Sequence, residues 1–507
     1  MSTTQSFLMS FVEFTAALFI FIIGIIGIIA LIVYIKDVTQ TKQAILRNYP
    51  IIGHFRYLFE HLGEFFRQYF FAMDREELPF NRAQRTWVYK AAKNVSNTVA
   101  FGSTKDLRKR GSVLFVNSPF PTLDEDAVPS LKTTIGKDCL MPYSTEAIFC
   151  ISGMSYGAIS KPAVLSLSYG AKKAGIWMNT GEGGLSPYHL EGDCDIVFQI
   201  GTAKNGVSDQ DGNLDDDLLR EVAAHPQVKM FELKLSQGAK PGKGGILPKE
   251  KVSKEIAAIR NIPVGEAAIS PNRHTDVSSN SDLLLLINRI RDVTGKPTGF
   301  KAVISDASWL DDLFTEIQKQ GIDSAPDFIV VDSADGGTGA APLPLIDDMG
   351  LPLRESLPML DNKLTEYGLR DRVKVIASGK LITPADVAWA ICLGADFCVS
   401  ARGFMFALGC IQALQCNKNT CPTGITTHDK NLQKGLIPDS KIDRVVDYAH
   451  NIEHEVGIIA HSCGVKEPRA LSRKHARIVT DHNLSIPMNQ LHPIPAVLKQ
   501  YKMNNKE

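Results

Sequence analysis

The sequence predicts an α/β protein: a (β/α)8 TIM barrel with an N-terminal transmembrane helix and a juxtamembrane extension. Three observations support this: a long apolar segment near the N-terminus, alternation of short apolar runs with helical patterns, and glycine-rich stretches after several of those runs. We therefore divide the chain into four predicted segments. They are a transmembrane helix at 14–35, a juxtamembrane and barrel-leading region at 36–146, the barrel at 147–430, and a C-terminal helical extension at 431–507.

The composition is that of a globular protein. Hydrophobic residues make up 44% and charged residues 22% of the 507 residues, unlike a disordered chain. Lys+Arg and Asp+Glu are balanced at 55 each, so no positive field indicates a nucleic-acid partner. Nine cysteines are too few for a disulfide framework. Three of them lie close together near residue 415, which indicates a metal or cluster site in a reducing compartment.

The N-terminal segment 14–35 has no charged residue and is rich in Ile, Leu and Phe. As a helix it is roughly 33 Å long, enough to cross a bilayer core of about 30 Å. A cleaved signal peptide would begin with basic residues, whereas 1–12 contain no Lys or Arg. We therefore expect a retained single-pass helix, in preference to a cleaved signal or a buried core helix. The positive-inside rule places the catalytic body in the cytoplasm, because basic residues follow the segment at Lys36, Lys42, Arg47 and Arg56.

The barrel is predicted from alternating patterns. Short apolar runs are strand candidates at 148–151, 176–179, 197–201, 230–235, 266–270, 299–304, 328–332, 373–378 and 397–400. Helical patterns lie between several of them, at 281–293, 308–319, 360–369 and 384–393. This alternation predicts a parallel sheet with helices outside it. With about eight such units, a closed barrel fits better than an open sheet.

Glycine-rich stretches follow predicted strands, at the end of a barrel where active sites lie. They occur at 154–160, 179–184, 237–242 and 335–340. Glycine allows backbone N–H groups to approach a flat ring or a phosphate. Any one stretch could be an ordinary turn, but several at the same end of one barrel favour a binding site.

The last two strands predict a phosphate site. One ends in Ser378, Gly379 and Lys380, and the other is followed by Ala401 and Arg402. Loops after strands seven and eight of a barrel commonly bind phosphate, together with a helix N-terminus. Both cations could instead be solvated loop charges, but their paired placement favours phosphate.

Three lysines are candidates for a functional role. Lys234 and Lys301 lie within apolar strands, where an ammonium is costly unless it meets a carboxylate, a flavin or an anionic substrate. On an outward-facing position each would only pack against a helix. Lys240 lies in a glycine-rich loop, where it could pair with a substrate carboxylate or remain in water.

The most specific motif is Cys410-x5-Cys416-x4-Cys421-Pro422. Zinc sites usually place cysteines two to four residues apart, often in pairs, although His428 could supply a fourth ligand. Three thiolates at these wider spacings, the last followed by proline, better fit a loop around an iron–sulfur cluster. Three ligands suggest a three-iron cluster, or a four-iron cluster with one foreign ligand. Buried structural cysteines are the plainer alternative.

Together these segments resemble the FMN-binding synthase domain of the glutamate synthase family, from about Cys150 to Gly424. The resemblance rests on 154–160, 179–184, 234–242, 269–271 with His274 and Asp276, 335–340, 368–372 and 409–424. It implies that 147–430 is an FMN-binding barrel with FMN at its C-terminal mouth. It further implies that Cys410, Cys416 and Cys421 hold a [3Fe–4S] cluster.

The family's reaction is reductive amination of 2-oxoglutarate through 2-iminoglutarate, with reduced FMN fed by the cluster. By resemblance, Lys301 would face flavin and substrate, while Glu232 and Lys234 would polarise or protonate the substrate. The expected FMN contacts are Met154, Ser155, Gly157, Asn179, Thr180, Glu182, Gln237, Lys301, Gly336, Gly337, Thr338, Gly339, Ser378, Gly379, Lys380, Ala401 and Arg402.

The sequence also departs from the full enzyme. It has no cysteine before Cys139 to act as a glutaminase nucleophile, and Lys243 interrupts a stretch that is usually acidic. We expect a short, membrane-anchored branch that takes ammonia from solution or from a separate subunit. No dinucleotide fingerprint stands out, so the expected electron donor is ferredoxin or a separate reductase subunit.

Two alternatives remain open. One is a different FMN barrel enzyme that acts on a related 2-oxo acid and an amine, such as an N-methylglutamate synthase-like enzyme. An α-hydroxy-acid dehydrogenase is disfavoured by the cysteine motif. The other is a membrane-tethered electron-transfer subunit that keeps both cofactors without turnover.

Overall fold

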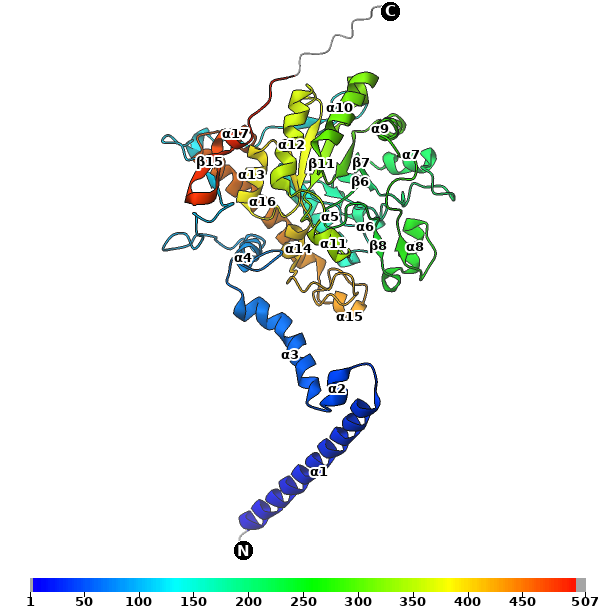
Figure 1. The fold of residues 1–507 in the computed structure, drawn as a ribbon, viewed down its shortest axis with the longest axis vertical. Coiled ribbons are helices and arrows are strands. Elements are labelled where there is room, and N and C mark those ends of the chain that lie inside the picture. The colour runs from blue at the N-terminus through cyan, green and yellow to red at the C-terminus, as the bar shows by residue number, and fades with distance from the viewer. Residues whose placement is uncertain (1–2, 498–507) are drawn as a thin grey trace, which may run out of the picture. The chain divides into compact units, whose positions relative to one another are not determined.

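The computed structural model describes residues 3–497 and divides into two compact units at Ala83 and Gln84 (Figure 1). The first unit is helical, with α1 (Thr3–Thr39), α2 (Ala44–Asn48), α3 (Gly53–Phe66) and the π-helical turn η1 (Arg67–Phe71). The predicted span 14–35 lies within α1. The part of this helix from Phe7 to Thr39 contains an 18-residue window with a mean hydropathy of 3.2, so it is long and apolar enough to cross a membrane.

The second unit is built on a closed, all-parallel barrel, which confirms the predicted fold class. Most barrel residues are buried on both faces, as expected for strands covered by helices. The strands, in chain order, are β4 (Phe149–Ile151), β5 (Met178–Asn179), β6 (Ile196–Ile200), β7 (Val228–Lys234), β10 (Thr298–Ala302), β11 (Phe328–Asp332), β12 (Lys374–Ser378) and β13 (Phe397–Ser400).

One predicted barrel strand is wrong. The run 266–270 contains only the short strand β9 (Ala268–Ile269), which pairs antiparallel with β8 (Ile246–Leu247) outside the barrel. Ile269 is 72% exposed, so this run has no buried face to place against a core. Here an apolar run formed a hairpin within the long connection between β7 and β10.

A helix follows each barrel strand and packs outside the sheet. These helices are α5 (Lys161–Ala174), α6 (Pro187–Glu191), α7 (Asp216–Ala224), α9 (Asn280–Thr294), α10 (Ala307–Gln320), α12 (Leu353–Glu366), α13 (Pro384–Cys392) and α14 (Arg402–Leu408). Side chains of Ser160, Asp215, Ser279, Asp306 and Thr383 accept N-cap hydrogen bonds and so define several helix starts. The helical pattern at 360–369 covers only the second half of α12.

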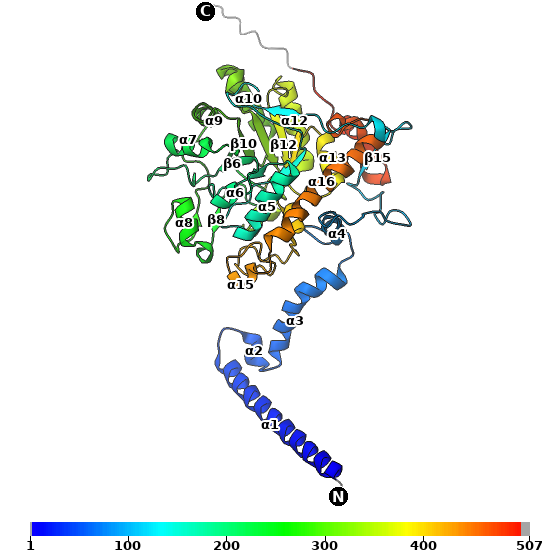
Figure 2. The same cartoon turned by 180° about the vertical axis from the view of Figure 1, so that it is seen from behind.

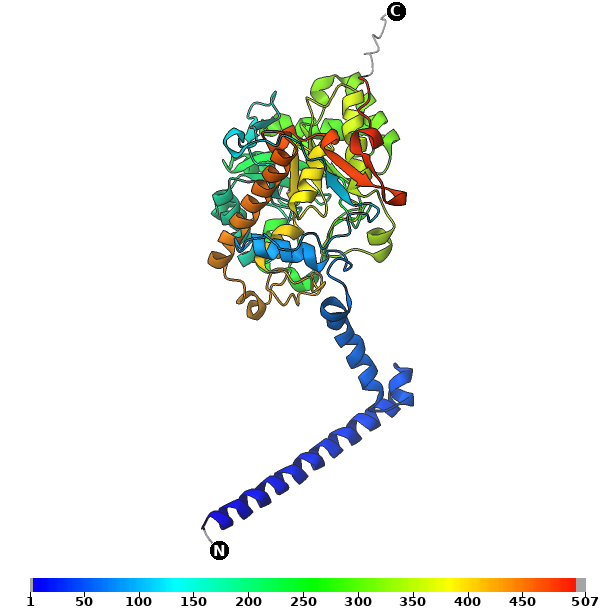
Figure 3. The same cartoon turned by 90° about the vertical axis from the view of Figure 1, so that its left-hand side faces the viewer.

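The C-terminal extension, which the sequence predicts to be helical, contains strands as well as helices. The long helix α16 (Pro438–Ser462) packs along α5 (Figure 2). After it, β14 (Ala476–Val479) and β15 (Ser485–Pro487) form an antiparallel sheet with β1 (Val113–Phe115) (Figure 3). This pairing ties the barrel-leading region to the C-terminal segment. The stretch 498–507 of the predicted extension lies outside the described residues.

The remaining elements are short. They are α4 (Arg82–Ala91), the hairpin β2 (Thr133–Ile135) and β3 (Tyr143–Thr145), η3 (Lys249–Lys251), α8 (Lys254–Arg260), α11 (Leu343–Asp347), α15 (Lys430–Gln433) and α17 (Met488–Leu491), with 3-10 turns η2 (Asp124–Asp126), η4 (Ile322–Ser324), η5 (Pro468–Ala470), η6 (Arg473–His475) and η7 (Asp481–Asn483).

Candidate active site at the mouth of the barrel

Polar side chains gather at the carboxyl ends of the barrel strands. Glu232 and Lys234 lie on β7, and Lys301 on β10 is directly opposite Lys234 in the register. Residues two apart on a strand point to the same face, so Glu232 and Lys234 share one side of β7. All three are buried. The structure thus brings the three predicted catalytic residues together at the end of the barrel that forms active sites.

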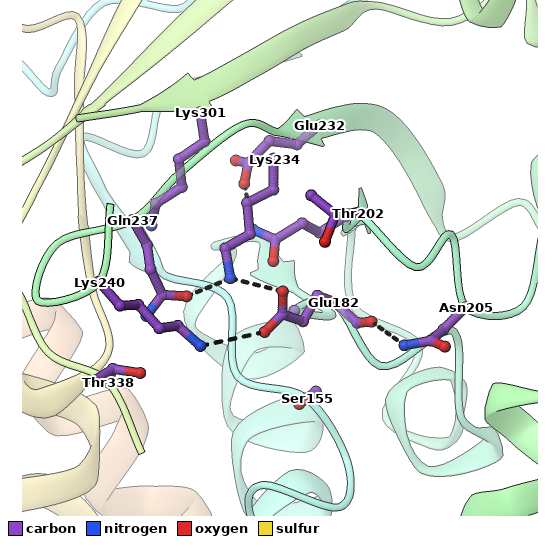
Figure 4. A network of polar contacts seen from close by, with 12 residues as sticks. Ser155, Glu182, Thr202, Asn205, Glu232, Lys234, Gln237, Lys240, Lys301 and Thr338 are labelled. Atoms are coloured by element: carbon purple, nitrogen blue, oxygen red, sulfur yellow. Dashed lines mark hydrogen bonds and ion pairs between the residues drawn. The ribbon is translucent and has the colours of Figure 1, made fainter. Parts of the chain in front are cut away.

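Glu182, just after β5, is the hub of the site (Figure 4). Its Oε2 accepts from Lys234 Nζ at 2.9 Å, and its Oε1 lies 3.7 Å from Lys240 Nζ. Lys234 Nζ also donates to the amide oxygen of Gln237. Burial raises the pKa of Glu182, but the two ammonium groups outweigh it and hold the pKa at about 2. Glu182 is therefore ionised at neutral pH.

Lys240 is buried, unlike an ordinary surface lysine. It is 5% exposed. Burial, aided by the nearby Lys234 charge, lowers the pKa of Lys240 to about 8, although Glu182 opposes the shift. Lys240 therefore belongs to the buried network, whereas the sequence left open whether it stays in water.

Glu232 has a contrasting environment. Its carboxylate accepts hydrogen bonds from Asn179 Nδ2 at 3.1 Å and from the side-chain amide of Gln199. Burial raises the pKa of Glu232, although Lys301 and these two hydrogen bonds oppose the shift. Two carboxyl groups at one mouth thus have pKa values displaced in opposite directions, a pattern typical of acid–base sites.

Lys301 meets Asp332, which sequence reasoning did not single out. Lys301 Nζ lies 3.4 Å from Asp332 Oδ2 and 3.5 Å from Ser378 Oγ. Asp332 also accepts the backbone N–H of Gly238 at 2.8 Å. This pairing holds the Lys301 ammonium at the mouth and joins β10, β11 and β12 to the loop after β7.

The glycine-rich stretches pack on one another in pairs. Gly181 has a φ of +66°, and a Cβ there would lie 2.5 Å from Ser155 N. A Cβ on Gly238 would lie 2.0 Å from the Ser333 carbonyl oxygen and 2.8 Å from Gly336 Cα. Side chains would thus separate these loops. Gln237 reinforces the second pair through a 3.2 Å bond from its Nε2 to the Gly337 carbonyl.

The predicted phosphate residues also converge, but on an acidic side chain. Lys380 Nζ lies 2.8 Å from Asp335 Oδ2, and Arg402 Nη2 donates to the Asp335 carbonyl at 3.4 Å. Gly337 adjoins Arg402, since a Cβ there would lie 2.7 Å from Arg402 Nε. Burial lowers the pKa of Arg402 to about 10. The two cations are suited to binding a phosphate, but in this structure Asp335 already partly neutralises their charge.

The three predicted cluster ligands lie on the cysteine loop, defined here as residues 409–428. They are unpaired thiols. Burial raises the pKa of Cys410 to about 12, with smaller contributions from nearby Cys416 and Cys421, so the three thiols share one electrostatic neighbourhood. Among residues 3–497, no group of three His, Cys, Asp or Glu side chains is gathered for a single metal ion. His428, the possible fourth ligand of the zinc alternative, contacts the Gly157 carbonyl through Nε2 at 2.8 Å.

Arg260 is a site residue that sequence reasoning missed. Its guanidinium donates to Ser155 Oγ at 3.3 Å and to the Tyr156 carbonyl at 3.1 Å. It is 6% exposed, and within the described residues its buried Nε has no hydrogen-bond acceptor. An arginine at the end of a short helix, remote in sequence from the other site residues, carries no periodic signal. Its placement follows from the folded path of the β7–β10 connection.

Comparison with known proteins identifies the family. Residues 90–466 match the family described as "Conserved region in glutamate synthase". The chain belongs to the glutamate synthase family. It is thus a glutamate-synthase-like oxidoreductase. The glutamate synthase large subunit-like protein YerD of Bacillus subtilis is 40% identical over 482 residues, which cover 87% of this chain and 91% of that protein.

More distant relatives match the same region. The archaeal-type glutamate synthase [NADPH] of Thermotoga sp. is 34% identical over 73% of this chain and 69% of its own length. Among solved structures, a chimera of (S)-mandelate dehydrogenase has a TM-score of 0.47 at 13% identity, covering 77% of this chain and 98% of that chain. A likeness at that level bears on neither substrate nor cofactor.

Proposed function

We propose that this chain catalyses glutamate-synthase-type reductive amination of 2-oxoglutarate through 2-iminoglutarate. The observation that carries the proposal is the buried network of Glu182, Lys234 and Lys240 beside Glu232 and Lys301. Such a network offers cations for a dicarboxylate and a protonatable acid at one mouth. Membership of the glutamate synthase family supports the same reaction class.

We assign FMN to this mouth, which the glycine loops line with little side-chain bulk; a Cβ on Gly339 would meet no atom within 4 Å. Bound there, FMN would supply hydride to the substrate. The residues we assign to its ring are those of the glycine loops: Met154, Ser155, Gly157, Asn179, Thr180, Glu182, Gln237, Gly336, Gly337, Thr338 and Gly339. Those assigned to its phosphate end are Ser378, Gly379, Lys380, Ala401 and Arg402.

Lys301 is proposed to lie against the flavin, where its ammonium would stabilise negative charge. Its ion pair with Asp332, 3.4 Å long, orients the ammonium. Asp332 in turn accepts the Gly238 N–H, which fixes the carboxylate. Lys301 is thereby held in one position before substrate binds.

The substrate would be oriented by the cations around Glu182. Lys234 and Lys240 each place an ammonium on the same carboxylate, and the Arg260 charge also acts on it. Within the part of the chain that the structure describes, the buried Nε of Arg260 has no hydrogen-bond partner. A substrate carboxylate would compete with Glu182 for these donors. Glu232, with its raised pKa, is the group we assign to proton delivery to the substrate.

The cluster assignment is supported by the spacing of three cysteines on one loop, none of which forms a disulfide, and by the influence of Cys416 and Cys421 on the pKa of Cys410. We assign Cys410, Cys416 and Cys421 as ligands of a [3Fe–4S] cluster that passes electrons to FMN. Ferredoxin or a separate reductase subunit would supply those electrons, and ammonia would come from solution or from another subunit. Nucleic acid has no place in the proposal, since the chain carries no net charge.

We further propose that α1 anchors the protein as a single-pass membrane helix with the catalytic body in the cytoplasm. Its length and apolar composition support this, and the basic residues that follow it support the orientation. Alkaline carbonate extraction tests the anchor. Full-length protein should stay with the membrane pellet, and release into the supernatant would refute anchoring.

Product analysis under anaerobic conditions tests the proposed reaction. Detergent-purified protein receives reduced methyl viologen, 2-oxoglutarate and either ammonium or methylamine. Glutamate from ammonium supports the proposal, whereas N-methylglutamate alone would favour the amine-utilising alternative. A protein that holds both cofactors but forms neither product would favour an electron-transfer subunit.

A further inference from the structure

Lys251 is a buried lysine that the proposed reaction does not use. It ends η3 and is 3% exposed. Its Nζ donates to the carbonyl oxygens of Ala158 at 3.2 Å, Cys416 at 2.8 Å and Thr426 at 2.6 Å. An ammonium has three N–H donors, and burying it is costly unless they are bonded. The three carbonyls match that need.

The three acceptors belong to two loops that are far apart in the sequence. Ala158 lies on the loop after β4, here called the β4 loop (residues 152–160), which contains several proposed flavin contacts. Cys416 and Thr426 lie on the cysteine loop. A single side chain from a third segment therefore joins the loop proposed to border the flavin to the loop proposed to hold the cluster.

Two further contacts join the same pair of loops. The backbone N–H of Ser160 donates to the Ile425 carbonyl at 2.8 Å. His428 Nε2 lies 2.8 Å from the Gly157 carbonyl, so the ring must carry its proton on Nε2 to donate there. Of the three links, Lys251 alone reaches the carbonyl of a proposed cluster ligand.

We propose that Lys251 is a positioning residue that fixes the spacing between the β4 loop and the cysteine loop, and thereby the rate of electron transfer from cluster to flavin. The inference rests on the proposed function. Each electron comes from an external one-electron donor such as a ferredoxin. The cluster is oxidised as the flavin is reduced, and two such transfers are needed per hydride. Electron transfer slows steeply with separation, so a small displacement of either loop changes the rate.

The Lys251 charge has a second, measurable consequence. A cation held against the carbonyl of Cys416 favours the more negative, reduced cluster. Removing it should make reduction of the cluster about tenfold less favourable, which is about 59 mV for a one-electron couple. A role confined to holding the fold would leave this potential unchanged in a variant that still binds both groups.

The test uses full-length, detergent-purified protein with three variants. Lys251→Met keeps the length but removes the charge and donors, and Lys251→Arg keeps both with a different shape. Lys249→Met removes an exposed lysine from the same turn and is the matched control. For each protein, FMN and iron are quantified, the cluster potential is titrated by EPR, and flavin reduction by reduced methyl viologen is followed by stopped flow.

The expected result is at least tenfold slower flavin reduction in Lys251→Met, about threefold slower in Lys251→Arg, and no change in Lys249→Met. Lys251→Met with the wild-type rate and potential would overturn the inference. If that variant does not fold, Lys251→Arg decides: a rate within measurement error of wild type overturns the inference. Wild-type protein without FMN or without iron would instead refute the proposed function itself.

Discussion

Lys234 Nζ lies 2.9 Å from Glu182 Oε2, and this ion pair joins the ends of two barrel strands, β5 and β7. Lys240 reaches the other oxygen of the same carboxylate at 3.7 Å. The result is a carboxylate with more than one cationic partner in a largely buried position. Removing the acid would leave two ammonium groups without their shared counter-charge. The network can therefore be tested by substituting either Glu182 or one of its lysines.

Glu182→Gln should destabilise the fold in a pH-dependent way. The folded pKa is about 2 against an ordinary 4.5, so ionised Glu182 contributes roughly 3 kcal/mol above pH 4.5. This contribution is lost as pH falls from 4.5 toward 2. Chemical denaturation of both proteins should show the full gap at pH 6 and a smaller one at pH 3. The exposed Glu250→Gln is the control, and a gap independent of pH would contradict the assignment.

Lys240 should make substrate binding sensitive to alkaline pH. With a pKa of about 8, its ammonium loses its proton above that pH and can no longer pair with a carboxylate. KM for 2-oxoglutarate should therefore rise by up to about fivefold between pH 8 and 9. Lys240→Arg should abolish the rise, and the exposed loop variant Lys243→Met should retain it. A wild-type KM that stays flat over this range would remove Lys240 from substrate binding.

Glu232→Gln should impair catalysis without unfolding the site. The amide is isosteric with the carboxyl group, and its one oxygen can keep one of the two hydrogen bonds that Asn179 and Gln199 donate to different oxygens of Glu232, but it cannot deliver a proton. We expect kcat to fall by about 10²-fold or more, with KM for 2-oxoglutarate changed less than threefold. Steady-state kinetics with FMN content as the control makes the comparison. A kcat within a factor of three of wild type would exclude Glu232 as the proton donor.

Gly238→Ala should separate two loops at the mouth. The new Cβ would lie 2.0 Å from the Ser333 carbonyl oxygen, which cannot move as a flexible side chain would. We expect a loss of about 1–3 kcal/mol in the free energy of unfolding and weaker retention of FMN on gel filtration. Gly457→Ala on α16 is the matched control, since its Cβ meets only His461 at 3.8 Å. Equal stability of the two variants would contradict the close packing of the loops.

The barrel and its mouth could be predicted from the sequence because both depend on local patterns. Buried parallel strands appear as apolar runs, and residues at their ends, such as Glu232 and Lys301, must meet at one rim. Arg260 and Asp332 were missed because their partners come from other segments of the fold. The run at 266–270 was misassigned since an apolar run does not show whether a core lies beside it. The strands β14 and β15 are also not predicted, because β14 pairs with β1, which lies far away in the sequence.

Stopped-flow reoxidation of the chemically reduced protein tests the central claim most directly. Reduced, detergent-purified protein is mixed anaerobically with 2-oxoglutarate, ammonium, or both, and the flavin absorbance is followed. The proposed function predicts that the oxidised flavin band returns rapidly only with both substrates, with one glutamate formed per flavin reoxidised. A preparation that shows no flavin band, or a reduced flavin that the substrate pair does not reoxidise, would contradict it.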